Sequence, residues 1–131
     1  MPVSYQFEPG PSRPLASYGA PSRDPKISIR ASGAMYLLAV SGNRSNSKLG
    51  LAISHDGGDS FAPPTLISQK SSRVSSHGEN SPTFSFGNGI EAYALWEERT
   101  GEGLETELLF AKSPAFGHRW LPPIRVTDKT T

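Results

Sequence analysis

The sequence predicts an all-β chain made of two copies of one structural unit, and three observations support this. The 131 residues include 13 glycines and 12 prolines, a composition that favours turns over helices. Short segments with the alternating pattern of β-strands recur from residue 25 onward. A polar turn that ends in an aromatic residue occurs twice, 59 positions apart. A repeat of this length, with strands between its copies, is typical of a propeller or a similar array.

The two polar turns cover residues 54–61, SHDGGDSF, and residues 113–120, SPAFGHRW. In the first, Ser54 and Asp56 can accept hydrogen bonds from nearby backbone N–H groups. Glycines supply the positive φ angles of such a turn, and Phe61 is expected to pack on the apolar layer beneath it. Ala115 replaces the aspartate in the second turn, which is therefore expected to depend on Gly117 and Trp120.

The chain divides into five segments. They are an irregular arm at 1–24, a first unit at 25–70, a polar connecting loop at 71–80, a second unit at 81–128 and a tail at 129–131. Each unit is expected to hold four strands. The expected strands are 26–30, 35–40, 49–54 and 65–68, then 81–86, 90–96, 106–112 and 124–128. Tyr93 follows Tyr36 by 57 positions, whereas the two polar turns are 59 positions apart. The hairpin between Tyr93 and the second turn therefore carries a two-residue insertion.

Composition excludes several classes of function. A net charge of +1 gives no electrostatic basis for binding nucleic acid or an anionic membrane surface. The absence of cysteine excludes disulfides and thiolate metal sites, and no residue pattern indicates a cofactor. No apolar run approaches the ~20 residues that span a bilayer. The N-terminal residues lack the pattern of a secretory signal, and the compartment is not indicated.

The two turns resemble the Asp-box, or BNR repeat, of sialidases (neuraminidases) and their relatives. In that family the box joins the third and fourth strands of a propeller blade, away from the active site. The resemblance covers residues 23–128 and implies a sialidase-like β-propeller segment of two four-stranded antiparallel blades. It implies structural roles for the box residues, which are Ser54, Asp56, Gly58, Phe61, Ser113, Gly117 and Trp120.

The resemblance also implies where ligand-binding residues should lie. An Arg-Ile-Pro element opens the first blade of sialidases, and its arginine binds the substrate carboxylate. Here the element reads Arg23-Asp24-Pro25, so Arg23 is a ligand-binding candidate, although it could instead be a solvated loop residue beside Asp24. The family's catalytic acid, an aspartate, belongs in the loop after the second strand of that blade, and here this loop contains Arg44, a second candidate, and no carboxylate. The amides of that loop cannot donate a proton to a leaving group.

Other polar residues have two interpretations each. Glu79 precedes an expected inner strand and could bind a sugar hydroxyl, or it could belong to a polar loop that bonds its own backbone. The charged run 97–99 could contact a ligand or face water. Trp96 and Trp120 could stack on a sugar, but the repeat places both in the core. The spacing of His55, His77 and His118 does not indicate a metal site.

Three functions follow from these expectations. The chain could be part of a glycan-processing propeller completed by other blades, a non-catalytic propeller that binds glycans or proteins, or a structural unit that assembles by blade stacking. Because propellers need about four to eight blades, the expected partners are a glycan and either further blades or other copies of the chain. A six-bladed ring, the sialidase number, would need three copies. Members of the family are often secreted or periplasmic.

Overall fold

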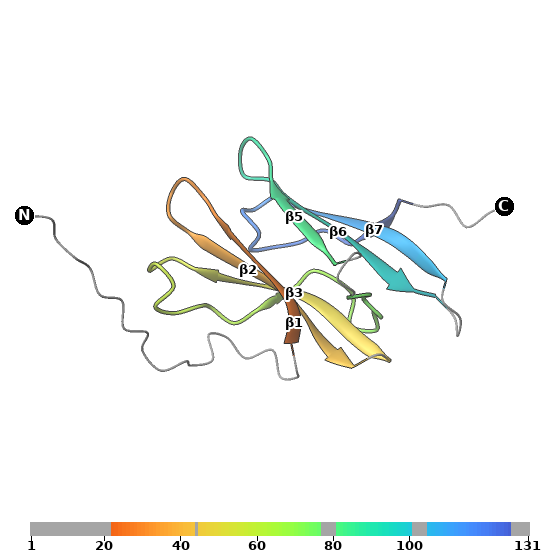
Figure 1. Ribbon diagram of the computed structural model, residues 1–131. Coiled ribbons are helices and arrows are strands. Elements are labelled where there is room, and N and C mark those ends of the chain that lie inside the picture. The colour runs from red at the N-terminus through yellow and green to blue at the C-terminus, as the bar shows by residue number, and fades with distance from the viewer. Residues whose placement is uncertain (1–21, 44, 77–80, 101–104, 127–131) are drawn as a thin grey trace, which may run out of the picture.

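Two four-stranded antiparallel sheets form the protein, and its described residues contain no helix (Figure 1). The computed structural model describes residues 22–43, 45–76, 81–100 and 105–126. The first sheet consists of β1 (Ser22–Ile29), β2 (Met35–Asn43), β3 (Asn46–Ser54) and β4 (Thr65–Leu66). The second consists of β5 (Thr83–Phe86), β6 (Ala92–Arg99), β7 (Thr106–Ser113) and β8 (Ile124–Arg125). Within each sheet, every strand pairs with the next along the chain, so the predicted all-β class and the two four-stranded sheets are confirmed.

The first strand begins earlier than predicted. β1 starts at Ser22, inside the segment 1–24 that the sequence predicts to be an irregular arm. Its pairing with β2 shifts register between Arg23 and Lys26, and Asp24 has a φ of 53°. Because Pro25 has no N–H to donate, this bulge lets the strand pass the proline without losing its pairing on either side.

The central hairpins are longer than predicted. β2 and β3 reach Asn43 and Asn46, although the sequence predicts a loop over 41–47, and β6 continues through the charged run to Arg99. Segment 72–75 accounts for both extensions. Ser72 O accepts the Ser47 N–H of the first sheet at 3.1 Å, and the Ser75 N–H donates to Glu97 O of the second sheet at 2.7 Å. This segment therefore pairs with both sheets at the same end of the molecule.

The fourth strands are shorter than predicted, with two residues each. In the first sheet, the Ser68 hydroxyl accepts the Leu49 N–H at 2.8 Å. A side chain there takes the place of a backbone partner, so the regular ladder ends at Leu66. Residues 127 and 128, predicted to extend the last strand, lie outside the described residues.

The hydrophobic core lies between the sheets, which pack face to face. We call the two packed surfaces the inner faces. The first inner face presents Tyr36, Leu38, Val40, Leu49, Leu51 and Ile53. The second presents Phe84, Phe86, Ala94, Trp96, Leu109 and Ala111. The Tyr36 ring lies 4.9 Å from Phe86 and 5.8 Å from Phe84, so aromatic contacts join β2 to β5.

The first polar turn, residues 54–61, closes on its own side chains between β3 and β4. Ser54 Oγ accepts from the Gly58 N–H at 2.9 Å and donates to Asp56 Oδ1 at 2.8 Å. Asp56 Oδ1 also accepts the Ser60 N–H at 2.9 Å, and Oδ2 accepts the Ser60 hydroxyl. These are the backbone-capping roles predicted for Ser54 and Asp56.

The second polar turn, residues 113–120, has a simpler hydrogen-bond pattern and lies against the first sheet. Ser113 Oγ accepts the Gly117 N–H at 2.8 Å, as Ser54 does for Gly58. The Tyr36 hydroxyl donates to Phe116 O at 2.5 Å, and the Arg30 guanidinium lies 4.0 Å from the Phe116 ring centroid. This turn therefore helps to hold the two sheets together.

Candidate functional site

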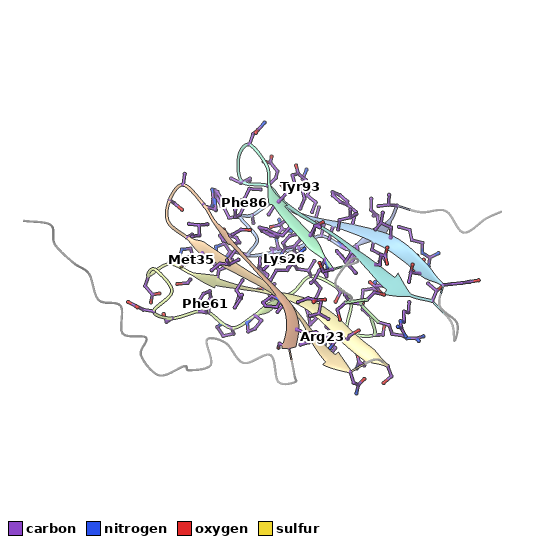
Figure 2. The ribbon with its side chains drawn as sticks, in the orientation of Figure 1. Arg23, Lys26, Met35, Phe61, Phe86 and Tyr93 are labelled. Atoms are coloured by element: carbon purple, nitrogen blue, oxygen red, sulfur yellow. The ribbon has the colours of Figure 1, made fainter. Side chains whose placement is uncertain are left out.

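Arg23 is a half-buried strand residue at one end of the first sheet (Figure 2). Its Nη1 donates to Gly42 O at 2.7 Å, and its Nε donates to Ser76 Oγ. The guanidinium thus joins the start of β1 to the β2–β3 hairpin and to the segment that precedes β5. Arg23 is held in place by these contacts and is not a solvated loop residue.

Asp24 lies in the bulge beside Arg23. Its Oδ2 atom is buried and has no hydrogen-bond partner among the described residues. Arg23 Nε and Nη1 donate to Ser76 Oγ and Gly42 O, so the neighbouring Asp24 does not occupy these two nitrogens.

The β2–β3 hairpin places amides and hydroxyls near Arg23. Asn43 Oδ1 accepts from the Ser45 N–H (3.0 Å), the Ser45 hydroxyl (2.8 Å) and the Asn46 N–H (3.0 Å). Gly42 has a φ of 110°, and a Cβ there would meet Asn46 O at 2.1 Å, so only glycine fits. Residues 41–47 contain no carboxylate. The candidate Arg44, within this hairpin, lies outside the described residues.

The end of β6 lies at the same end of the molecule as Arg23. Val74 forms an isolated bridge with Glu98, and Ser75 bonds to Glu97. Glu98 Oε2 accepts the Trp96 indole N–H at 2.8 Å, so this carboxylate supports a core side chain. The candidate Glu79 and the neighbouring His77 lie outside the described residues.

The two tryptophans have the packing roles predicted for them. Trp96 is only 1% exposed, which leaves no ring face for a sugar. Trp120 is half-buried against the core, with its ring centroid 6.2 Å from that of Phe84 and its indole N–H donated to Gly117 O at 3.0 Å. Phe61, the equivalent residue of the first turn, is half-buried and lines a hollow of about 330 Å³ with Ile53, His55 and Asp56.

Hydrogen bonds from Ser60 and Ser54 lower the pKa of the exposed Asp56 carboxyl from 3.8 to about 2. The Ser60 hydroxyl and N–H are the largest causes, because both stabilise the charged form. Asp56 is therefore ionised at neutral pH, and both of its carboxylate oxygens accept hydrogen bonds within its own turn. Such a carboxylate is suited to holding the turn and not to proton transfer.

The structure brings two histidines together that the sequence separates. His55 and His118, from the first and second turns, have stacked rings with centroids 5.8 Å apart. Within the described ranges, no group of three histidine or carboxylate residues could hold a metal ion. The pair therefore marks a contact between the two turns.

Each sheet also has an outer face, on the side away from the core, whose apolar side chains reach solvent. The first outer face presents Ile27, Ile29, Met35 and Leu66, and the second presents Tyr93, Leu95, Phe110 and Ile124. Ile27 and Ile29 are 58% and 59% exposed, and Ile124 is 59% exposed. On the second face, Tyr93, Leu95 and Phe110 line a hollow of about 200 Å³ with Thr83 and Ser85.

The sequence contained a partial signal for these faces. The stretch from Met35 to Val40 is apolar on both sides, which is the pattern of a strand between two packed layers. It did not indicate which side would contact the other sheet. The sequence therefore led to the expectation of assembly by blade stacking without indicating which faces would remain exposed for it.

No protein-family model matches the chain, and no curated protein is significantly similar to it. Among the residues that the structure describes, no helix is long and apolar enough to cross a membrane.

Proposed function

We propose that the two sheets are neighbouring blades of a sialidase-like Asp-box β-propeller and that this chain recognises glycans at the end that carries Arg23. The position of the Arg23 guanidinium, between Gly42 O and Ser76 Oγ, carries the proposal. It lies where β1, the β2–β3 hairpin and segment 72–76 meet. Because two of its nitrogens are already anchored, its remaining N–H donors are pre-oriented for a carboxylate or a sugar hydroxyl.

The proposed activity is binding without hydrolysis. Glycoside cleavage needs a carboxylic acid beside the leaving oxygen. The hairpin nearest Arg23 offers only amides, hydroxyls and Arg44 over residues 41–47. Such groups can bind sugar hydroxyls, but they cannot supply the proton.

The test is a titration of the ¹⁵N-labelled chain with N-acetylneuraminic acid, with neutral galactose as the matched control. We expect saturable shifts at the backbone N–H groups of Ser45 and Ser76, weaker shifts with galactose, and weaker binding by Arg23→Lys. That variant keeps the positive charge but loses the planar donor geometry. Circular dichroism checks that it folds.

Two results would refute parts of this proposal. Unchanged N–H shifts at millimolar acidic sugar would exclude glycan recognition at this end. Release of 4-methylumbelliferone from its sialoside would show hydrolysis and would contradict binding without turnover.

A second candidate is a purely structural or protein-interaction propeller segment. The exposed apolar residues of the two outer faces favour it, because large exposed apolar patches mark interaction sites. In that case the chain would fold and associate, and no sugar would shift the resonances around Arg23.

A further inference from the structure

The register of the strands makes the two sheets equivalent residue by residue. Tyr36 pairs with Ser28 in the first sheet, and Tyr93 pairs with Ser85 in the second. Both members of the second pair lie 57 positions after those of the first. In the third strands the offset is 59, so Leu51 corresponds to Phe110.

This equivalence exchanges the inner and outer faces. Tyr36, Leu38 and Leu51 of the first inner face correspond to Tyr93, Leu95 and Phe110 of the second outer face. Conversely, Ile27, Ile29 and Ala52 of the first outer face correspond to Phe84, Phe86 and Ala111 of the second inner face. The two outer faces are thus counterparts of the two faces that already bind each other within the chain.

We propose that the first outer face of one copy of this chain docks on the second outer face of another copy, in a head-to-tail contact that repeats the internal interface. Phe84 and Phe86 pack on Tyr36 inside the chain. In the contact between copies, Ile27 and Ile29 take their places and pack on Tyr93.

The polar turns extend the same correspondence. Inside the chain, the second turn lies on the first inner face, with the Tyr36 hydroxyl bonded to Phe116 O. Residue 57 of the first turn corresponds to residue 116. The Tyr93 hydroxyl of a second copy therefore donates to Gly57 O in the proposed contact.

The contact between copies is more polar than the internal one. Glu97 and Lys112 on the second outer face replace Val40 and Ile53 of the first inner face. Val40 and Ile53 are buried in the internal interface, so charged side chains at these positions lose part of their hydration in the contact between copies, which lowers its affinity. We therefore expect reversible association that increases with protein concentration.

The first part of the test uses one variant for each face. Ile29→Glu places a charge on the first outer face, and Tyr93→Lys places one on the second. Light scattering and sedimentation velocity should show concentration-dependent association of the wild type, and each variant alone should remain at the 14.1 kDa monomer mass. Ile90→Glu is the matched control, because Ile90 is 48% exposed in the turn between β5 and β6. It should associate like the wild type.

The second part mixes the two variants in equal amounts. Ile29→Glu retains an intact second outer face, and Tyr93→Lys retains an intact first outer face. A head-to-tail contact therefore predicts a 1:1 complex of about twice the 14.1 kDa mass and nothing larger. Circular dichroism of each variant confirms that it is folded.

Three results would overturn the proposal. The first is a wild type that stays monomeric at the highest soluble concentration, which would assign the faces to another partner. The second is a face variant that associates like the wild type. The third is a mixture that forms no complex. The proposal depends on the equivalence of the sheets and not on the glycan site. The sugar titration and the mass measurement can therefore fail independently.

Discussion

The substitution Gly117→Ala tests the packing of the second polar turn on the first sheet. Gly117 has a φ of +83°, and a Cβ there would lie 2.9 Å from Tyr36 Cε2 and 3.0 Å from Leu51 Cδ2. The left-handed backbone costs an alanine about 1–2 kcal/mol. Since Tyr36 and Leu51 are each only 1% exposed, they cannot move aside freely, and overpacking adds about 1–3 kcal/mol. We expect a total loss of about 2–5 kcal/mol in the free energy of unfolding.

Gly57→Ala is the matched control for this substitution. Gly57 has a φ of +72° in the first turn, and a Cβ there would have nothing within 4 Å. It should lose only the backbone contribution of about 1–2 kcal/mol. Urea denaturation of the wild type and both variants, followed by circular dichroism, gives the two losses.

The difference between the two losses isolates the packing of the turn on the first sheet. We expect Gly117→Ala to be the more destabilising by about 1–3 kcal/mol. Equal losses would show that the second turn does not press on Tyr36 and Leu51, and the described arrangement of the sheets would be wrong.

Two further predictions concern the core and the first turn. Trp96→Ala should lower the free energy of unfolding by about 3–5 kcal/mol because the ring is fully buried. Trp120→Ala should lower it less because that ring is half-buried. A larger loss for Trp120→Ala in urea denaturation would contradict this. The pKa of Asp56 is about 2 in the fold against an ordinary 3.8, so its ionised form stabilises the fold above pH 3.8, and that contribution disappears as the pH falls toward 2. The melting temperature of Asp56→Ala should therefore lie below that of the wild type near neutral pH and approach it near pH 2. A gap that stays constant over this range would show that the carboxylate does not hold the turn.

The sequence predicted the strands because their patterns are local. The alternation along β1, the apolar run of β2 and the repeated turns depend on residues that are close in the chain. The limits of the hairpins depend on distant partners. Ser41 and Ser47 look like loop residues, yet they are buried in strands, and Ser47 is bonded to segment 72–74.

The candidate site was predictable only in part. The Arg-Asp-Pro element made Arg23 a candidate, but the sequence placed this residue in the irregular arm 1–24 and not in a strand, and its partner Ser76 lies 53 residues away and carries no sequence signal. The bulge at Asp24 was also invisible, since nothing in the sequence requires an aspartate to adopt a positive φ. Which face of each sheet would be buried could not be decided, because both sides of Met35 to Val40 are apolar.

Two equivalent sheets meet through non-equivalent faces, with Tyr36 inside the interface and Tyr93 outside it. Nuclear Overhauser effects measured on the Ile29→Glu variant test this most directly. We expect contacts from the Tyr36 ring to Phe86 and Gly117, and contacts from the Tyr93 ring confined to its own sheet. Contacts from the Tyr93 ring to the first sheet within one chain would contradict it.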